Sequence, residues 1–417
     1  MGRFSFDVLR IRDFRILLLT RMFGVMALQC QAVIVGWQIY SMTKDPFMLG
    51  LTGLVEAIPA ISCALFAGHF VDKGKPHRVY FWCYLTLALN TLALFIFAGG
   101  YYPLEKGSLL PVIYLCIFVS GLARSFIIPA AFSLLPQIVP RNLIPAASAW
   151  QSSCFEIATI GGPAIAGILY ATQGAHGAWI LPVTLMSFSF ISQNFINSKN
   201  HVYKPKKKEP AVESITAGWK FILRNPVLLS VMTLDMFAVL FGGAVSMLPA
   251  YADKVLHVGA EGLGTLRAAP AMGAVLTALL LATRPMKILS AKRLLLVVAG
   301  FGLSIIGFGL SKIFWLSMVF LAISGCCDSI SMVIRGTLMQ LLTPEEMRGR
   351  VSSVNSMFII SSNEIGSFES GTAAKLLGLV PSVVMGGCAT LLIVSVMAFS
   401  SPRFRQTVVK IGEDDKD

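Results

Sequence analysis

Two stretches of the chain that lie 204 residues apart decide the fold: SGLARSFIIPAAFSLLPQIVP at 120–140 and SGCCDSISMVIRGTLMQLLTP at 324–344. Identical residues recur at matched positions in and just after them, and both stretches keep a glycine near the start and a proline at the end. The matched pairs are Ser120 and Ser324, Gly121 and Gly325, Ser125 and Ser329, Leu134 and Leu338, Pro140 and Pro344, Ser148 and Ser352, and Ser152 and Ser356. Such a repeat predicts two duplicated halves.

Composition places these halves in a membrane. The 417 residues are 55% hydrophobic and 13% charged, with a mean hydropathy of +0.74, whereas a soluble domain is roughly a quarter charged. Apolar runs of about twenty residues can cross the hydrocarbon core as helices. We therefore predict an all-α membrane protein of about twelve transmembrane helices, at 14–42, 48–70, 79–99, 109–137, 145–172, 179–197, 226–252, 260–283, 294–310, 314–341, 350–377 and 382–401.

A polar, Lys-rich segment separates the two halves. It begins with SKNHVYKPKKKEPAVES at 198–214. We predict an N-terminal half at 1–197, a cytoplasmic linker with a short amphipathic segment at 198–225, a C-terminal half at 226–401 and a cytoplasmic tail at 402–417.

The distribution of cations predicts the orientation. With a cytoplasmic amino terminus, the outer loops hold only Lys44, Lys106, Lys254 and Lys312, and the inner segments hold most other cations. This is the positive-inside pattern, so we expect both termini in the cytoplasm and the chain in a bacterial inner (plasma) membrane. The rule also explains the net charge of +13 without nucleic acid. The run Lys206–Lys208 is interpreted as a solvated linker near anionic lipid.

No enzymatic or metal chemistry is predicted. All eight cysteines fall inside predicted spans and are interpreted as packing residues, and the five histidines lack ligand spacing. We find no catalytic constellation and no phosphate-binding glycine loop. We therefore expect no enzyme, no cofactor and no metal. The expected partners are a small-molecule substrate, protons and the lipid bilayer, and the expected state is a monomer.

Charged residues inside the predicted spans are the strongest functional signal. A charge at the bilayer centre costs about 3 kcal/mol, so these residues should face a wet cavity or one another. The third, sixth, ninth and twelfth spans carry none, which predicts that they face lipid. The charged residues are Arg21, Glu56, Arg124, Glu156, Asp235, Arg267, Asp328, Arg335, Glu364, Glu369 and Lys375.

Two motifs add detail. AGHFVDKGKPHR at 67–78 joins the second and third spans, and GGPAIAG at 161–167 lies in the fifth. Small residues permit close helix approach, and a proline frees a backbone carbonyl. The second motif therefore predicts tight packing or a bend at a gate.

These features resemble the major facilitator superfamily over essentially the whole chain. The loop motif is similar to the family signature at Gly68 and Asp72, although Gly74 comes one residue early. The resemblance implies a cytoplasmic gate in which Asp72 accepts hydrogen bonds from the start of the eleventh helix and pairs with Arg348 or Arg350. The other predicted gating residues are Lys73, Arg78, Gly162, Pro163 and Gly167.

In this family the first, fourth, seventh and tenth helices line the central cavity. Stretches 121–150 and 343–371 resemble the drug and siderophore exporter branch, which includes enterobactin exporters and macrolide efflux proteins. The leading hypothesis is proton-coupled export of a small amphiphilic molecule by alternating access. Asp235, Asp328 and Glu156 are the candidates for proton coupling, and the candidate cavity residues are Arg21, Arg124, Glu56, Arg335, Trp37, Phe126, Phe237 and Phe241.

One pairing is predicted between cavity helices. Arg335 follows Asp328 by seven residues, roughly 10 Å along a helix, which we expect to be too far for direct contact without side-chain reach or water. Arg124 is therefore the candidate partner of Asp328. An uptake carrier or lysolipid flippase on the same fold remains an alternative, and so does a non-transporting membrane sensor.

Overall fold

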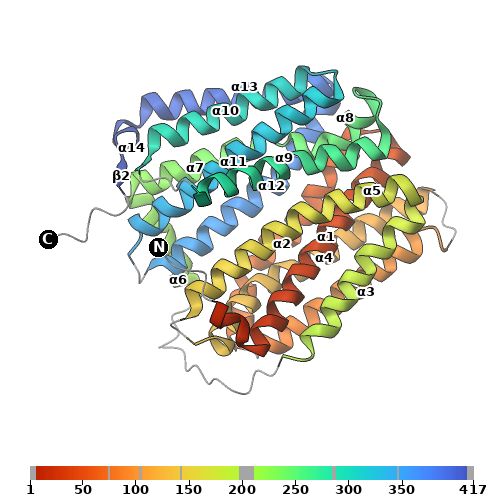
Figure 1. The fold of residues 1–417 in the computed structure, drawn as a ribbon, viewed down its shortest axis with the longest axis horizontal. Helices are drawn as coiled ribbons and strands as arrows, with labels where there is room; N and C mark the ends of the chain where they lie inside the picture. The colour runs from red at the N-terminus through yellow and green to blue at the C-terminus, as the bar shows by residue number, and fades with distance from the viewer. Residues whose placement is uncertain are drawn as a thin grey trace. The chain divides into compact units, whose positions relative to one another are not determined.

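The computed structural model describes residues 6–73, 76–102, 106–140, 143–196, 211–283, 288–344 and 347–410. Almost all of them are helical (Figure 1). After a short 3-10 helix, η1 (Phe6–Arg10), the first five α-helices are α1 (Arg12–Thr43), α2 (Pro46–Lys73), α3 (Pro76–Ala98), α4 (Lys106–Ile138) and α5 (Ile144–Gln193).

The remaining elements follow residue 210. They are α6 (Ala211–Arg224), α7 (Pro226–Phe241), η3 (Ala244–Met247), α8 (Leu248–Lys254), α9 (Gly259–Thr283), α10 (Ala291–Leu310), α11 (Phe314–Leu342), α12 (Arg348–Leu377), α13 (Leu379–Ser400) and α14 (Pro402–Arg405). Strand β1 (Ile288–Ser290) pairs antiparallel with β2 (Val408–Lys410).

The helices of the described residues can supply the twelve predicted crossings. Nine segments within the described residues are long and apolar enough to span a membrane. One of them, Ala146–Gln193, lies within α5. The 50 residues of α5 are broken at Gly174 by a φ of 67°, a backbone conformation that favours glycine. The sixth crossing therefore continues α5 with hardly a loop. Helices α9 and α12, of 25 and 30 residues, supply the other two crossings.

Helix boundaries follow from local sequence. Asn225 caps α7, because its side chain accepts a hydrogen bond from the Leu228 N–H and Pro226 occupies the first turn. Pro in that position has no N–H to satisfy. Helix α7 ends at Phe241 with Gly242 as its C-cap, and η3 and α8 continue the same crossing.

The chain forms two compact units, and each has its own apolar core. Unit 1 comprises residues 1–43 and 55–211, and unit 2 comprises 44–54 and 212–417. The boundary at 211–212 falls inside the predicted linker. Residues 44–54, however, belong to unit 2, although the sequence surrounding them belongs to unit 1. The division into 1–197 and 226–401 therefore stays a prediction.

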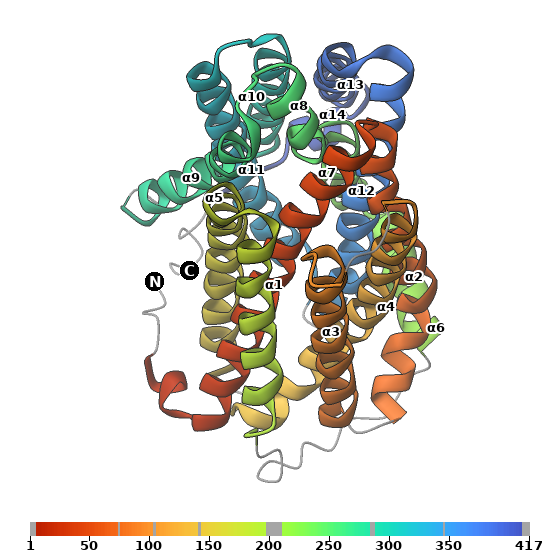
Figure 2. The same cartoon turned by 90° about the vertical axis from the view of Figure 1, so that its right-hand side faces the viewer.

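In unit 1, α1 packs along α5, and α3 packs against α4 and α5. Its core includes Leu17, Tyr80 and Leu134, and the buried Gln38 joins three helices by bonding the Ala98 carbonyl oxygen and the Trp179 indole N–H. In unit 2, α9 packs on α11, and α10 lies beside α11 and α13 (Figures 1 and 2).

Candidate transport site

Two carboxylates meet one guanidinium in unit 2. Arg335 of α11 forms an ion pair with Asp235 of α7 through its Nη1, and its Nη2 lies 3.9 Å from Asp328 Oδ1. The side chains of Asp235 and Arg335 are only 11% and 13% exposed, while Asp328 is 48% exposed. Among the described contacts, one cation therefore lies beside two acids, and one of these acids is half-exposed.

The contact between Asp328 and Arg335 corrects a sequence prediction. Two helical turns separate their backbones, but the long arginine side chain bends back along the α11 face and reaches the carboxylate. The reason for giving Asp328 a different cation thus disappears. Its proposed partner Arg124 forms an ion pair with Glu56 in unit 1.

The pair of Glu56 and Arg124 joins α2 to α4. Between them Gly121 lies against α2 so closely that a Cβ there would come within 2.7 Å of the Glu56 carbonyl oxygen. This close approach allows the two side chains to meet. Gly325, the repeat counterpart of Gly121, packs in the same manner on the Pro270 backbone of α9. The duplicated glycines therefore hold equivalent pairs of helices together.

Arg21 has an amide partner. Its Nη1 donates a hydrogen bond to Gln151 Oε1 at 2.8 Å, which joins α1 to α5. This neutral partner satisfies the donor and leaves the positive charge in place.

The glycine-proline motif forms the tightest part of the α1 and α5 contact. A Cβ on Gly162 would lie 2.9 Å from the Met26 carbonyl oxygen, and the Cys30 thiol donates to the Gly162 carbonyl oxygen at 3.2 Å. Pro163 and Gly167 are buried in the same helix. The predicted close approach is thus present, within unit 1.

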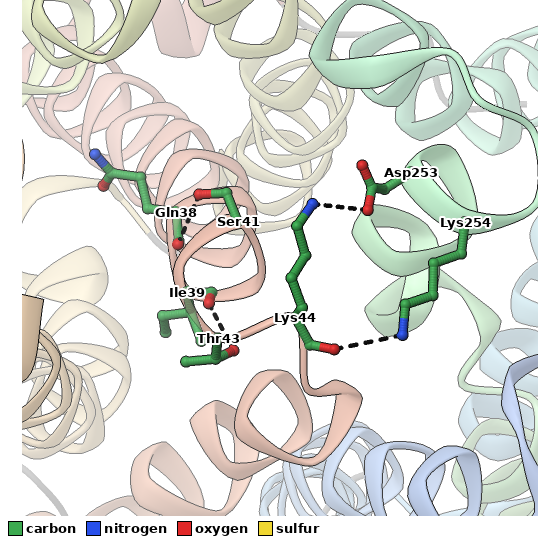
Figure 3. Close-up of polar contacts among 7 residues, drawn as sticks. All are labelled: Gln38, Ile39, Ser41, Thr43, Lys44, Asp253 and Lys254. Atoms are coloured by element: carbon green, nitrogen blue, oxygen red, sulfur yellow. Dashed lines mark hydrogen bonds and ion pairs between the residues drawn. The ribbon is translucent and has the colours of Figure 1, made fainter.

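A network of charges surrounds the connection between α1 and α2. Lys44 Nζ lies 2.8 Å from Asp253 Oδ2, and Lys254 Nζ donates to the Lys44 carbonyl oxygen at 3.4 Å (Figure 3). Lys44 adopts a left-handed backbone with a φ of 52°, which costs a non-glycine residue roughly 1 kcal/mol or more. The two contacts with α8 hold this conformation.

The next residue continues the network on α12. Asp45 Oδ2 lies 2.9 Å from Lys375 Nζ, and Asp45 Oδ1 accepts the Phe47 N–H at 2.9 Å. Partial burial opposes ionisation of Asp45, but these hydrogen bonds and the nearby positive charges of Lys375 and Lys254 together lower its pKa. Lys375 was predicted to lie within the hydrocarbon. In the structure, Lys375 lies in the last turn of α12 and is half-exposed.

Behind these ion pairs, the first turns of α2 pack on α12 through glycine. A Cβ on Gly50 would lie 2.7 Å from the Gly371 Cα, and the Phe47 and Phe368 rings meet edge to face at 5.9 Å. We call residues 44–54, with these contacts to α8 and α12, the outer clasp. No local sequence pattern indicates this contact, because Asp45 and Lys375 are 330 residues apart and lie in different repeats.

Comparison with known proteins decides the family. Residues 4–410 match the family model described as transmembrane secretion effector. The chain belongs to this family of major facilitator transporters. It is 25% identical over 418 residues to the enterobactin exporter EntS of Escherichia coli O1:K1, covering 96% of this chain and 95% of that protein.

Solved structures show the same fold at lower identity. The transporter has a TM-score of 0.72 with the POT family transporter PepTSo, at 10% identity and with 94% of this chain and 98% of that chain covered. The TM-score with a bacterial homologue of the iron transporter ferroportin is 0.66, at 15% identity and with 92% and 99% covered. The predicted fold class and the predicted family are therefore confirmed.

The aromatic residues predicted for a cavity wall lie in both units of the transporter. Phe237 and Phe241 of α7 stack at 6.3 Å with an interplanar angle of 12°. Phe126 packs against the core of unit 1, and Trp37 in α1 is half-buried.

Several predicted residues of the transporter fall outside what the structure describes. These are the side chains of Glu156, Asp72, Lys73 and Arg348, while Gly68 is placed only as part of α2. Arg78 is exposed on α3, and Arg350 Nη1 lies 3.6 Å from Met347 Sδ. The cytoplasmic gate between Asp72 and the start of α12 stays a prediction.

Proposed function

We propose that this transporter is a proton-coupled exporter of small amphiphilic molecules, siderophore-like or drug-like, and that it works by alternating access. The observation that carries this proposal is the cluster of Asp235, Arg335 and Asp328. One cation balances one carboxylate, so two ionised acids leave a net negative charge that a proton would neutralise. Because this imbalance is costly in a membrane interior, proton binding and release there can store and return free energy.

Asp328 is the group through which the proton would enter and leave. It is four times as exposed as Asp235 and lies at the edge of ion-pair distance from Arg335. When Asp328 is protonated, Arg335 holds Asp235 alone. When Asp328 ionises, it competes for the same guanidinium, and the resulting shift between α7 and α11 would favour one of the two access states.

Other residues have supporting roles in this proposal. Glu56 with Arg124, and Arg21, carry charge in the spans of unit 1, and Glu156 remains the next candidate for proton coupling. Export as the direction is supported by the similarity to the enterobactin exporter EntS. An inner-membrane location with both termini in the cytoplasm, and a monomeric state, complete the proposal.

Reconstituted transport tests the proposal. Proteoliposomes with a pH-sensitive dye inside would receive enterobactin and a panel of drugs and lysolipids, with and without a proton gradient. We expect substrate-dependent proton movement in the wild type and none in Asp328→Asn, while substrate binding remains. Asp7→Asn, an exposed change in η1, is the control. Uptake along a proton gradient would instead indicate a carrier or flippase, and binding without flux would indicate a sensor.

A further inference from the structure

Arg267 is a cation in unit 2 that does not belong to the cluster of Asp235, Arg335 and Asp328. It lies in α9 and is partly buried. The broad apolar side of this helix is occupied by Met272, Leu276 and Leu280, which are 60%, 56% and 56% exposed. At 3.6 residues per turn, Arg267 lies on a different flank, which it shares with Ala271. This flank is distinct from the surface that would face lipid.

Within the described part of the chain, Arg267 forms no ion pair, and its buried Nε has no hydrogen-bond partner. Arg335 has two carboxylates and Arg124 has Glu56, so Arg267 differs from both. A cation in a membrane span is costly, and an unsatisfied buried donor adds to that cost. No described residue pairs with Arg267 to offset these costs, which points to a partner that binds reversibly.

A guanidinium presents a planar set of donors that matches planar oxyanions such as carboxylates. We propose that Arg267 binds an acidic group of the transported molecule, so that the substrate class is an amphiphile carrying a carboxylate-like anion. This inference rests on the proposed transport function and adds a substrate class to it.

The packing of α9 on α11 keeps this anion site near the proton site without merging them. Gly325 contacts the backbone of Pro270, Arg267 precedes Pro270 by three residues, and Asp328 follows Gly325 by three. Since one crossing separates α9 from α11, the two helices run in the same direction. Arg267 therefore lies about two turns, roughly 9 Å, from Asp328 along the helices.

Equilibrium dialysis of the purified full chain with 1-naphthoate and 1-naphthamide tests the charge preference, because the two probes differ by one negative charge. We expect the wild type to bind the carboxylate on the order of tenfold more tightly than the amide. Arg267→Gln should bind both equally, and Arg267→Lys should keep part of the preference. Lys312→Gln, which removes an exposed cation in a loop, should behave like the wild type.

A second variant tests the same site if Arg267→Gln fails to fold. Ala271→Glu places a carboxylate one turn from Arg267, where it can pair with the guanidinium, and it should also abolish the preference. The proposal is overturned if either folded variant keeps the preference, or if the wild type shows no preference or binds neither probe. If binding depends on Arg267 but no proton movement accompanies transport, the proton-coupling proposal is overturned and the proposal for the Arg267 site stands.

Discussion

At the scale of single residues, the two acids on Arg335 should respond differently to removal. Asp235→Asn takes away the buried partner of a buried guanidinium, a loss of about 3 kcal/mol or more, offset in part by Asp328. Asp328→Asn removes a half-exposed carboxylate at 3.9 Å, which should cost under about 1 kcal/mol. Thermal unfolding in detergent would compare them. Equal losses of stability in the two variants would contradict the inference that Asp235 holds Arg335 more strongly than Asp328 does.

Neighbouring glycines in α5 provide a matched test of helix packing. Gly162→Ala puts a methyl group 2.9 Å from the Met26 carbonyl oxygen, whereas the nearest atom to a Cβ on Gly161 is Met26 Cε at 3.7 Å. We expect Gly162→Ala to destabilise unit 1 by roughly 1–3 kcal/mol and Gly161→Ala to have little effect. Unfolding temperatures of the two variants provide the measurement. If both behave alike, α1 and α5 are not in tight contact at Gly162.

At the scale of elements, a charge reversal tests the outer clasp. Asp45→Lys places a cation beside Lys375 and Lys254, and we expect it to lower the free energy of unfolding by about 1 kcal/mol. Adding Lys375→Asp should restore part of this loss. Recovery of stability should be incomplete, because a lysine side chain at position 45 cannot accept the hydrogen bond from the Phe47 N–H. Lys312→Asp, outside the clasp, should not rescue Asp45→Lys, and a double variant no better than the single one would exclude the ion pair.

The contribution of Asp45, in the outer clasp, to stability should depend on pH only in the acidic range. The pKa of Asp45 is lower in the folded chain than its usual value of about 3.9. Its contribution to stability is therefore fully present above about pH 4 and is lost as the pH falls through the lowered pKa. The stability difference between the wild type and Asp45→Asn should be constant from about pH 5 to 8. A change in that difference near neutrality would mean that Asp45 titrates there.

At the scale of the whole molecule, the sequence predicts local features better than distant contacts. The spans could be predicted because runs of about twenty apolar residues and flanking cations are local signals. The tight contact at Gly162 could be predicted from the small size of the residue. The contact between Asp328 and Arg335 depends on the reach of an arginine side chain over two helical turns, which spacing along a helix axis does not settle. The outer clasp was missed since nothing in sequence connects residues 45 and 375.

Residues 44–54 have a consequence for expression of the protein in pieces. A chain divided within 198–210 would give an N-terminal fragment that carries 44–54, the segment that completes unit 2. We expect the co-expressed fragments to reassociate and co-purify, because Asp253, Lys375 and Gly371 on the second fragment find their partners on the first. Removing those three contacts by substitution should reduce the yield of the reconstituted pair several-fold. The protein would then behave as a split protein, because helix α2 of the first fragment begins in unit 2 and continues in unit 1.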